Sequence, residues 1–146
     1  MDSDILYDEE RIGTILSDIQ RYLKDFEELG IHDVQDLEDK RNFYASSMVL
    51  FSLLNRVFDL GSEMAIAHNL GIPSTYREIF VLLQKDGIIG KDLAHEMVGL
   101  VTYRNLLSHE YQGISEEILF TLTKKIPDIR QFVGVMQDRI QHTKKM

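Results

Sequence analysis

The chain has 146 residues, of which 44% are hydrophobic, enough for one compact domain that buries about 70% of its unfolded surface. It contains no cysteine, which excludes a disulfide framework, a zinc or iron–sulfur site with cysteine ligands, and a thiol nucleophile. The net charge of -8 is uneven, with 13 Asp/Glu against 4 Lys/Arg in residues 1–40, so no DNA binding is expected and any RNA binding must depend on a local site.

The N-terminal sequence MDSDILYDEE is acidic and lacks the basic and apolar regions of a signal peptide. No stretch approaches the roughly 20 consecutive apolar residues that a membrane span needs. No internal repeat, low-complexity segment or linker interrupts the sequence. We therefore expect a single domain over residues 1–146 that is cytoplasmic and has no membrane contact.

Apolar residues recur at helical spacing through most of the chain, which predicts an all-α fold, an antiparallel bundle with short loops. The expected helices span residues 9–29, 36–70, 74–85 and 91–107, then one from 115 that continues from 127 to about 141. Gly30 is expected to end the first helix, and Ser74 to cap the third. Pro127 is expected at position N1 of the last segment, and residues 142–146 are expected to fray.

Two of these helices have informative faces. The first carries a single apolar stripe, formed by Ile12, Ile15, Leu16, Ile19, Leu23 and Phe26. The middle of the second, ASSMVLFSLLNRVFDL, is apolar over more than one face. It is therefore expected to be covered by several helices and also to be shared with another subunit.

Several motifs fail when their full pattern is required. The run from Gly87 to Lys91 resembles a phosphate loop, but the spacing is short and no strand precedes it. The pairs His95-Glu96 and His109-Glu110 each lack the second histidine of a zinc protease, and Asp92-x-x-His95 occurs only once, whereas di-iron bundles need two such motifs. We expect no metal and no cofactor.

The run RNLLSHEY, residues 104–111, closes the apolar fourth helix. Arg104 falls on the same stripe as Leu100 and Met97, where an unpaired charge would cost several kcal/mol, so it is expected to reach a cleft or an interface. Asn105 and His109 are four residues apart, and the amide is expected to orient the imidazole.

Arg104 and His109 lie about 140° apart around a continuous helix. They meet only if the helix ends near Ser108 or if a second subunit supplies one of them. A purely structural interpretation also exists, in which both cations complement the negative end of the helix dipole.

This run resembles the Arg-x4-His-x-Tyr motif of HEPN domains, in particular the HepT-like toxins of prokaryotic toxin–antitoxin pairs. The order of elements also matches over nearly the whole chain, although only the eight-residue motif is specific. Ser108 departs from the pattern, since relatives more often carry a small apolar residue there. The resemblance implies a four- to six-helix bundle that forms a homodimer, with the motifs of both subunits in one cleft.

The chemistry that the resemblance implies is metal-independent cleavage of RNA. His109 would act as general base or general acid and Arg104 would hold the scissile phosphate, with Asn105 and Ser108 in support. Tyr111 matches the tyrosine to which a partner nucleotidyltransferase of the minimal (MNT) type attaches AMP. Such a phosphate would compete with substrate for Arg104, so the partner would act as the antitoxin.

Two other functions stay open at this stage. One is a non-catalytic HEPN module that presents a substrate or nucleotide to a nucleotidyltransferase, and the other is a purely structural helical adaptor. The acidic N-terminal segment could repel bulk RNA or bind a basic patch of the antitoxin, and the sequence does not choose between these.

Overall fold

The computed structural model describes residues 5–109 and 114–145 of the chain. Over these residues the secondary structure is helical, which confirms the predicted all-α class. The elements are α1 (Glu9–Leu29), the short 3-10 helix η2 (Val34–Glu38), α2 (Lys40–Ala67), α3 (Tyr76–Lys85), α4 (Lys91–His109), α5 (Glu116–Thr123) and α6 (Ile126–Lys145).

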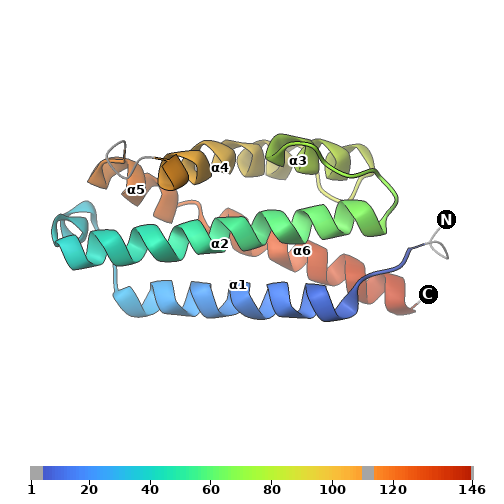
Figure 1. Ribbon diagram of the computed structural model, residues 1–146, viewed down its shortest axis with the longest axis horizontal. Helices are drawn as coiled ribbons and strands as arrows, with labels where there is room; N and C mark the ends of the chain where they lie inside the picture. Colours follow the sequence, from blue (N-terminus) through green and yellow to red (C-terminus); the bar gives the residue numbers. More distant parts are fainter. Residues whose placement is uncertain (1–4, 110–113, 146) are drawn as a thin grey trace.

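The helices form an elongated antiparallel bundle around α2 (Figure 1). Helix α1 runs along one side of α2, while α3 and α4 pack on each other and cover another side. Helix α6 contacts α2 and α4, and α5 packs against η2 at the end of the bundle far from the two termini. The central position of α2 explains why its sequence is apolar on several faces.

Helix α1 follows the predicted boundaries closely. Ile12, Ile15, Ile19, Leu23 and Phe26 are buried, and Leu16 is half-buried at the edge of the same stripe. Gly30 ends the helix with φ at 67°, a left-handed conformation that glycine adopts without a Cβ penalty.

The predicted start of the second helix at residue 36 is wrong. Asp33 and Asp36 close η2 with a reciprocal capping box, and Asp39 then begins α2 by accepting hydrogen bonds from the backbone of Arg41 and Asn42. Each carboxylate accepts hydrogen bonds from backbone N–H groups, which in a continuous helix would bond to the carbonyl groups of the preceding turn. At the other end α2 stops at Ala67, three residues early, where Asn69 takes a φ of 60°.

Three further boundaries differ from prediction. Thr75, not Ser74, caps α3, because its hydroxyl accepts from the Glu78 N–H while the Ser74 hydroxyl donates to the Glu78 carboxylate. Helix α4 continues two residues further, to His109. Pro127 is the second residue of α6, not the first.

The C-terminal tail does not fray as expected, since α6 continues to Lys145. Two contacts hold its last turn against the start of the chain. The Thr143 hydroxyl lies 3.1 Å from the Tyr7 hydroxyl, and Lys144 Nζ lies 3.0 Å from the Glu9 carboxylate. These contacts join the last turn of α6 to the segment around Tyr7 and Glu9.

Many carboxylates of the acidic N-terminal segment have partners within the chain. Asp8, Asp33, Asp36 and Asp39 cap helices, and Glu9, Asp18 and Glu27 form ion pairs. Hydrogen bonds from the backbone N–H groups of His32 and Asp33 lower the pKa of Asp36. Much of the negative charge in this segment therefore caps helices or binds α1 to other helices. The predicted alternatives, repulsion of RNA or binding of an antitoxin, stay open.

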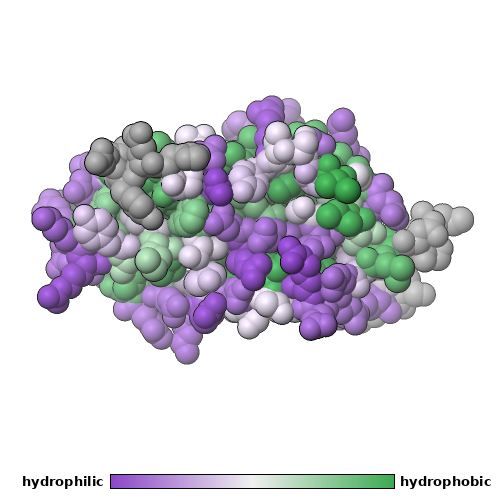
Figure 2. Space-filling model, in the orientation of Figure 1, coloured by the Kyte–Doolittle hydropathy of each residue, from purple (hydrophilic) through white to green (hydrophobic). Residues whose placement is uncertain are grey.

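One face of α2 keeps apolar side chains in contact with solvent. Tyr44 and Met48 are 61% and 70% exposed, and Phe51 and Asn55 continue the same stripe at helical spacing toward the middle of the helix. Figure 2 shows apolar side chains over the N-terminal half of α2. We call these four residues the α2 stripe.

Close packing of α2 against α3 depends on Gly61. A Cβ on this residue would lie 2.6 Å from Cγ2 of Ile79 and 3.4 Å from Cζ of Phe132, both of them buried core residues. The absence of a side chain thus sets how closely α3 approaches α2. That distance in turn places Tyr76, at the start of α3, beside α4.

We predict that Gly61→Ala lowers the free energy of unfolding by up to about 2 kcal/mol, because the overpacking cost of about 1–3 kcal/mol outweighs the gain of about 0.5–1 kcal/mol in helix propensity. The matched control is Gly13→Ala on the exposed side of α1, where an added Cβ meets nothing within 4 Å. This variant should gain about 0.5–1 kcal/mol. Urea denaturation measures both, and equal gains in the two variants would contradict the packing argument.

Candidate active site

Helix α4 places the motif at its C-terminal end. Leu93, Met97 and Leu100 are buried, as the apolar stripe predicts, and Arg104 continues that stripe as a half-buried side chain. The guanidinium therefore lies at the edge of the core, where α4 faces α2 and the start of α3.

The Arg104 guanidinium is fixed by neutral groups from two other helices. Its Nε donates a hydrogen bond of 3.0 Å to Oδ1 of Asn55 on α2. Its Cζ lies 4.9 Å from the ring centre of Tyr76 and 5.5 Å from that of Phe51, close enough for cation–π attraction. Together these contacts fix both the position and the plane of the guanidinium.

The other side of Arg104 faces its own helix. Nη1 lies 3.5 Å from Oδ1 of Asn105 and 3.4 Å from Oγ of Ser108, both long for hydrogen bonds. Ser108 in turn donates to the Asn105 backbone carbonyl at 3.0 Å. The structure thus brings Arg104, Asn105 and Ser108 together and leaves the η nitrogens weakly engaged.

The charge of Arg104 is not neutralised by any carboxylate of the described residues. Four arginines form ion pairs there, Arg11, Arg21, Arg56 and Arg130. Arg104 forms none, as is also true of Arg41, Arg77 and Arg139. A half-buried cation held only by neutral groups attracts an anion strongly, since no opposite charge competes for it. The planar fork of a guanidinium matches the geometry of a carboxylate or a phosphate.

His109 and Tyr111 are the other two residues of the motif. His109 is the last residue of α4, and Tyr111 lies outside the described residues. Because the helix is continuous through position 109, residues 104 and 109 start from directions about 140° apart on one helix. The predicted orientation of His109 by Asn105 stays a prediction.

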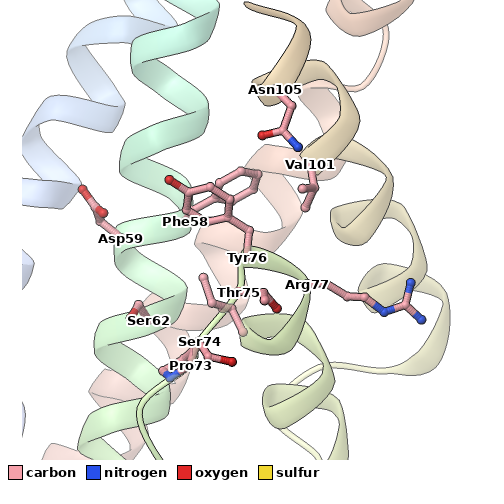
Figure 3. A pocket seen from close by; sticks show the side chains of 11 residues that line it. Phe58, Asp59, Ser62, Pro73, Ser74, Thr75, Tyr76, Arg77, Val101 and Asn105 are labelled. Atoms are coloured by element: carbon pink, nitrogen blue, oxygen red, sulfur yellow. The ribbon is translucent and has the colours of Figure 1, made fainter. Parts of the chain in front are cut away.

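A pocket of about 500 Å³ opens next to this cluster, between α2, α3 and α4 (Figure 3). Tyr76 and Asn105, which both contact Arg104, belong to its lining, so the pocket is adjacent to the guanidinium. Among the residues that the structure describes, no three His, Asp or Glu side chains gather to hold a metal ion.

The contact residues Asn55, Phe51 and Tyr76 were not identified from the sequence. Asn55 lies 49 residues before Arg104, inside an apolar run where a lone amide carries little signal. The one available indication was that a polar residue on a buried face needs a partner.

Comparison with known proteins identifies the family. The profile of the ribonuclease HepT-like family matches residues 15–136. The chain belongs to the ribonuclease HepT-like family. This confirms the resemblance drawn from the motif, and with it the prediction of a ribonuclease-class enzyme.

Individual HepT-like relatives agree with this assignment. The mRNA nuclease HepT of Shewanella oneidensis is 26% identical over 102 residues, which cover 67% of this chain and 77% of that protein. The tri-AMPylated HEPN toxin of Shewanella oneidensis, solved in complex with an MNT antitoxin, superposes with a TM-score of 0.78 at 22% identity, over 87% of this chain and 96% of that one.

A third similar structure is YutE of Bacillus subtilis, a cytosolic protein of unknown function. Its TM-score is 0.80 at 17% identity, over 94% of each chain. At such low identities the two structures establish the shared HEPN fold alone. No helix among the described residues has both the length and the hydropathy to cross a membrane.

Proposed function

We propose that the chain is a metal-independent ribonuclease toxin of a toxin–antitoxin pair. The observation that carries the proposal is the half-buried Arg104, held by neutral contacts and without a carboxylate among the described residues, at the motif position of a family of ribonucleases. Arg104 binds the scissile phosphate through its η nitrogens, because Nε is already engaged by Asn55.

His109 supplies the proton transfer in this proposal. An imidazole that titrates near neutrality can take the proton of a ribose 2′-OH or return one to the leaving 5′-oxygen. Arg104 stabilises the negative charge that accumulates on the phosphate as the 2′-oxygen attacks. Asn105 and Ser108 support Arg104 through the contacts described above.

A homodimer completes the site. Within one helix Arg104 and His109 diverge by about 140°, so the histidine that serves one arginine comes from the second subunit. The α2 stripe supports this arrangement, because its exposed end, Tyr44 and Met48, is continuous through Phe51 and Asn55 with the guanidinium. A second copy seated there buries the apolar side chains and brings its own motif to the site.

The antitoxin in this proposal is an MNT-type nucleotidyltransferase that attaches AMP to Tyr111. Tyr111 is two residues beyond His109, and an added phosphate there competes with RNA for Arg104. The support is that the Shewanella oneidensis HEPN toxin was solved both AMPylated and in complex with its MNT antitoxin.

We predict that Arg104→Ala lowers kcat/KM for RNA cleavage by about 10²–10³-fold, the usual cost of removing a donor to transition-state charge. His109→Ala should lose about 10²–10⁴-fold through the missing proton transfer. Arg130→Ala, which removes an exposed arginine paired with Glu27, is the control and should cleave like wild type. Cleavage by folded His109→Ala at the wild-type rate would contradict the proposed mechanism.

A second prediction concerns the neutral partner of Arg104. Asn55→Asp puts a carboxylate at the Arg104 Nε with almost no change in shape, so thermal stability should hold or rise while RNA affinity falls about tenfold or more. Asn55→Ala removes the hydrogen bond without adding charge and should have a smaller effect on affinity. The proposal requires that Asn55→Asp lowers RNA affinity more than Asn55→Ala does. Equal RNA affinity of Asn55→Asp and wild type would contradict it.

The dimer surface gives a third prediction. Met48→Glu places a charge in the middle of the α2 stripe and should convert the protein to an inactive monomer, because a buried unpaired charge costs several kcal/mol. Ile72→Glu, at an 82% exposed position outside the stripe, is the control. Analytical ultracentrifugation with RNA cleavage tests both, and an active dimer of Met48→Glu would place the interface elsewhere.

A further inference from the structure

The pocket beside Arg104 has no role in the chemistry proposed above. Two of its lining residues connect it to the phosphate-binding group. Tyr76 contacts the Arg104 guanidinium and also lines the pocket, and Asn105 follows Arg104 directly in α4. A strand whose phosphate lies on Arg104 therefore passes the mouth of the pocket.

The lining is a mixture of apolar surface and neutral hydrogen-bonding groups. Phe58, Tyr76, Ile79 and Val101 provide the apolar part, with the Phe58 and Tyr76 rings 5.0 Å apart between α2 and α3 (Figure 3). Ser62 and Asn105 provide a hydroxyl and an amide. Among the described residues, neither the Ser62 hydroxyl nor the Asn105 Nδ2 has a hydrogen-bond partner, so both can bind a ligand.

The two charged residues of the lining are directed away from its centre. Asp59 Oδ2 accepts from Nη1 of Arg56 at 3.1 Å, and its carboxylate turns toward the α1 side (Figure 3). The Arg77 side chain extends in the opposite direction, past α4. The interior is therefore neutral, which suits a nucleobase and ribose better than a phosphate.

We infer that this pocket binds one nucleoside of the RNA strand, the one attached to the phosphate on Arg104. The inference rests on the proposed ribonuclease function and adds a subsite to it. The volume of about 500 Å³ lies in the range of small-ligand pockets. Neutral donors and acceptors on an apolar wall are the means by which proteins hold an unstacked base. Asn105 joins the two subsites.

A single tryptophan tests this assignment, because the chain has none of its own. Ser62→Trp on α2 fills the pocket without replacing Arg104, His109 or any residue that contacts the Arg104 guanidinium. Ser17→Trp, on the exposed side of α1, is the matched control. Both variants are titrated with a short 2′-O-methyl RNA oligonucleotide, which binds but cannot be cut, and affinity is compared with wild type.

We expect Ser62→Trp to weaken RNA binding about tenfold or more and its fluorescence to change on titration. Ser17→Trp should keep wild-type affinity and a constant signal. In wild type, a nucleoside 5′-monophosphate should displace the oligonucleotide at concentrations where inorganic phosphate does not. If Ser62→Trp binds RNA with wild-type affinity and its fluorescence does not change, the inference is overturned. If circular dichroism shows that Ser62→Trp does not fold, Ser62→Leu is used in its place.

The same measurements separate this inference from the proposed function. The 2′-O-methyl oligonucleotide is bound without cleavage, so weak binding by Ser62→Trp supports the pocket even if wild type cuts no RNA. Cleavage by Ser62→Trp with an unchanged KM overturns the pocket assignment and leaves the ribonuclease proposal standing. A raised KM with unchanged kcat supports both.

Discussion

The hydrogen bond from Arg104 to Asn55 connects the two helices on which the site depends. It joins the motif helix α4 to the central helix α2 through an amide, at a point where a carboxylate would have formed an ordinary ion pair. Two aromatic rings hold the same guanidinium without cancelling its charge. The fold thus retains a fixed cation at the edge of its core, and the proposed phosphate binding depends on that one arrangement.

The geometry of a continuous helix then limits how catalysis can be assembled. Since α4 extends through His109, the arginine and histidine of one motif leave the helix about 140° apart. The α2 stripe runs from its exposed end, Tyr44 and Met48, to Phe51 and Asn55, which contact Arg104. The proposed dimer across this face accounts for both features, because a second copy there buries Tyr44 and Met48 and supplies the proposed second catalytic group.

The sequence predicts features that depend on local chemistry. Glycine at position 30 ends α1, and the apolar stripe of α4 continues to Arg104, because helix period and backbone freedom act within a few residues. The break before α2 was missed because Asp36 and Asp39 fit the solvent face of one continuous helix equally well. Asn55 and Tyr76 were missed because their contact with Arg104 exists only after three helices pack.

Complementation between two inactive variants tests the shared site most directly. Arg104→Ala and His109→Ala are purified separately, mixed in equal amounts under exchange conditions, and assayed for RNA cleavage. If each site takes its arginine and histidine from different subunits, half of the dimers carry one intact site, and activity returns to about a quarter of wild type. A mixture as inactive as its two components would contradict the shared site and place both groups in one subunit.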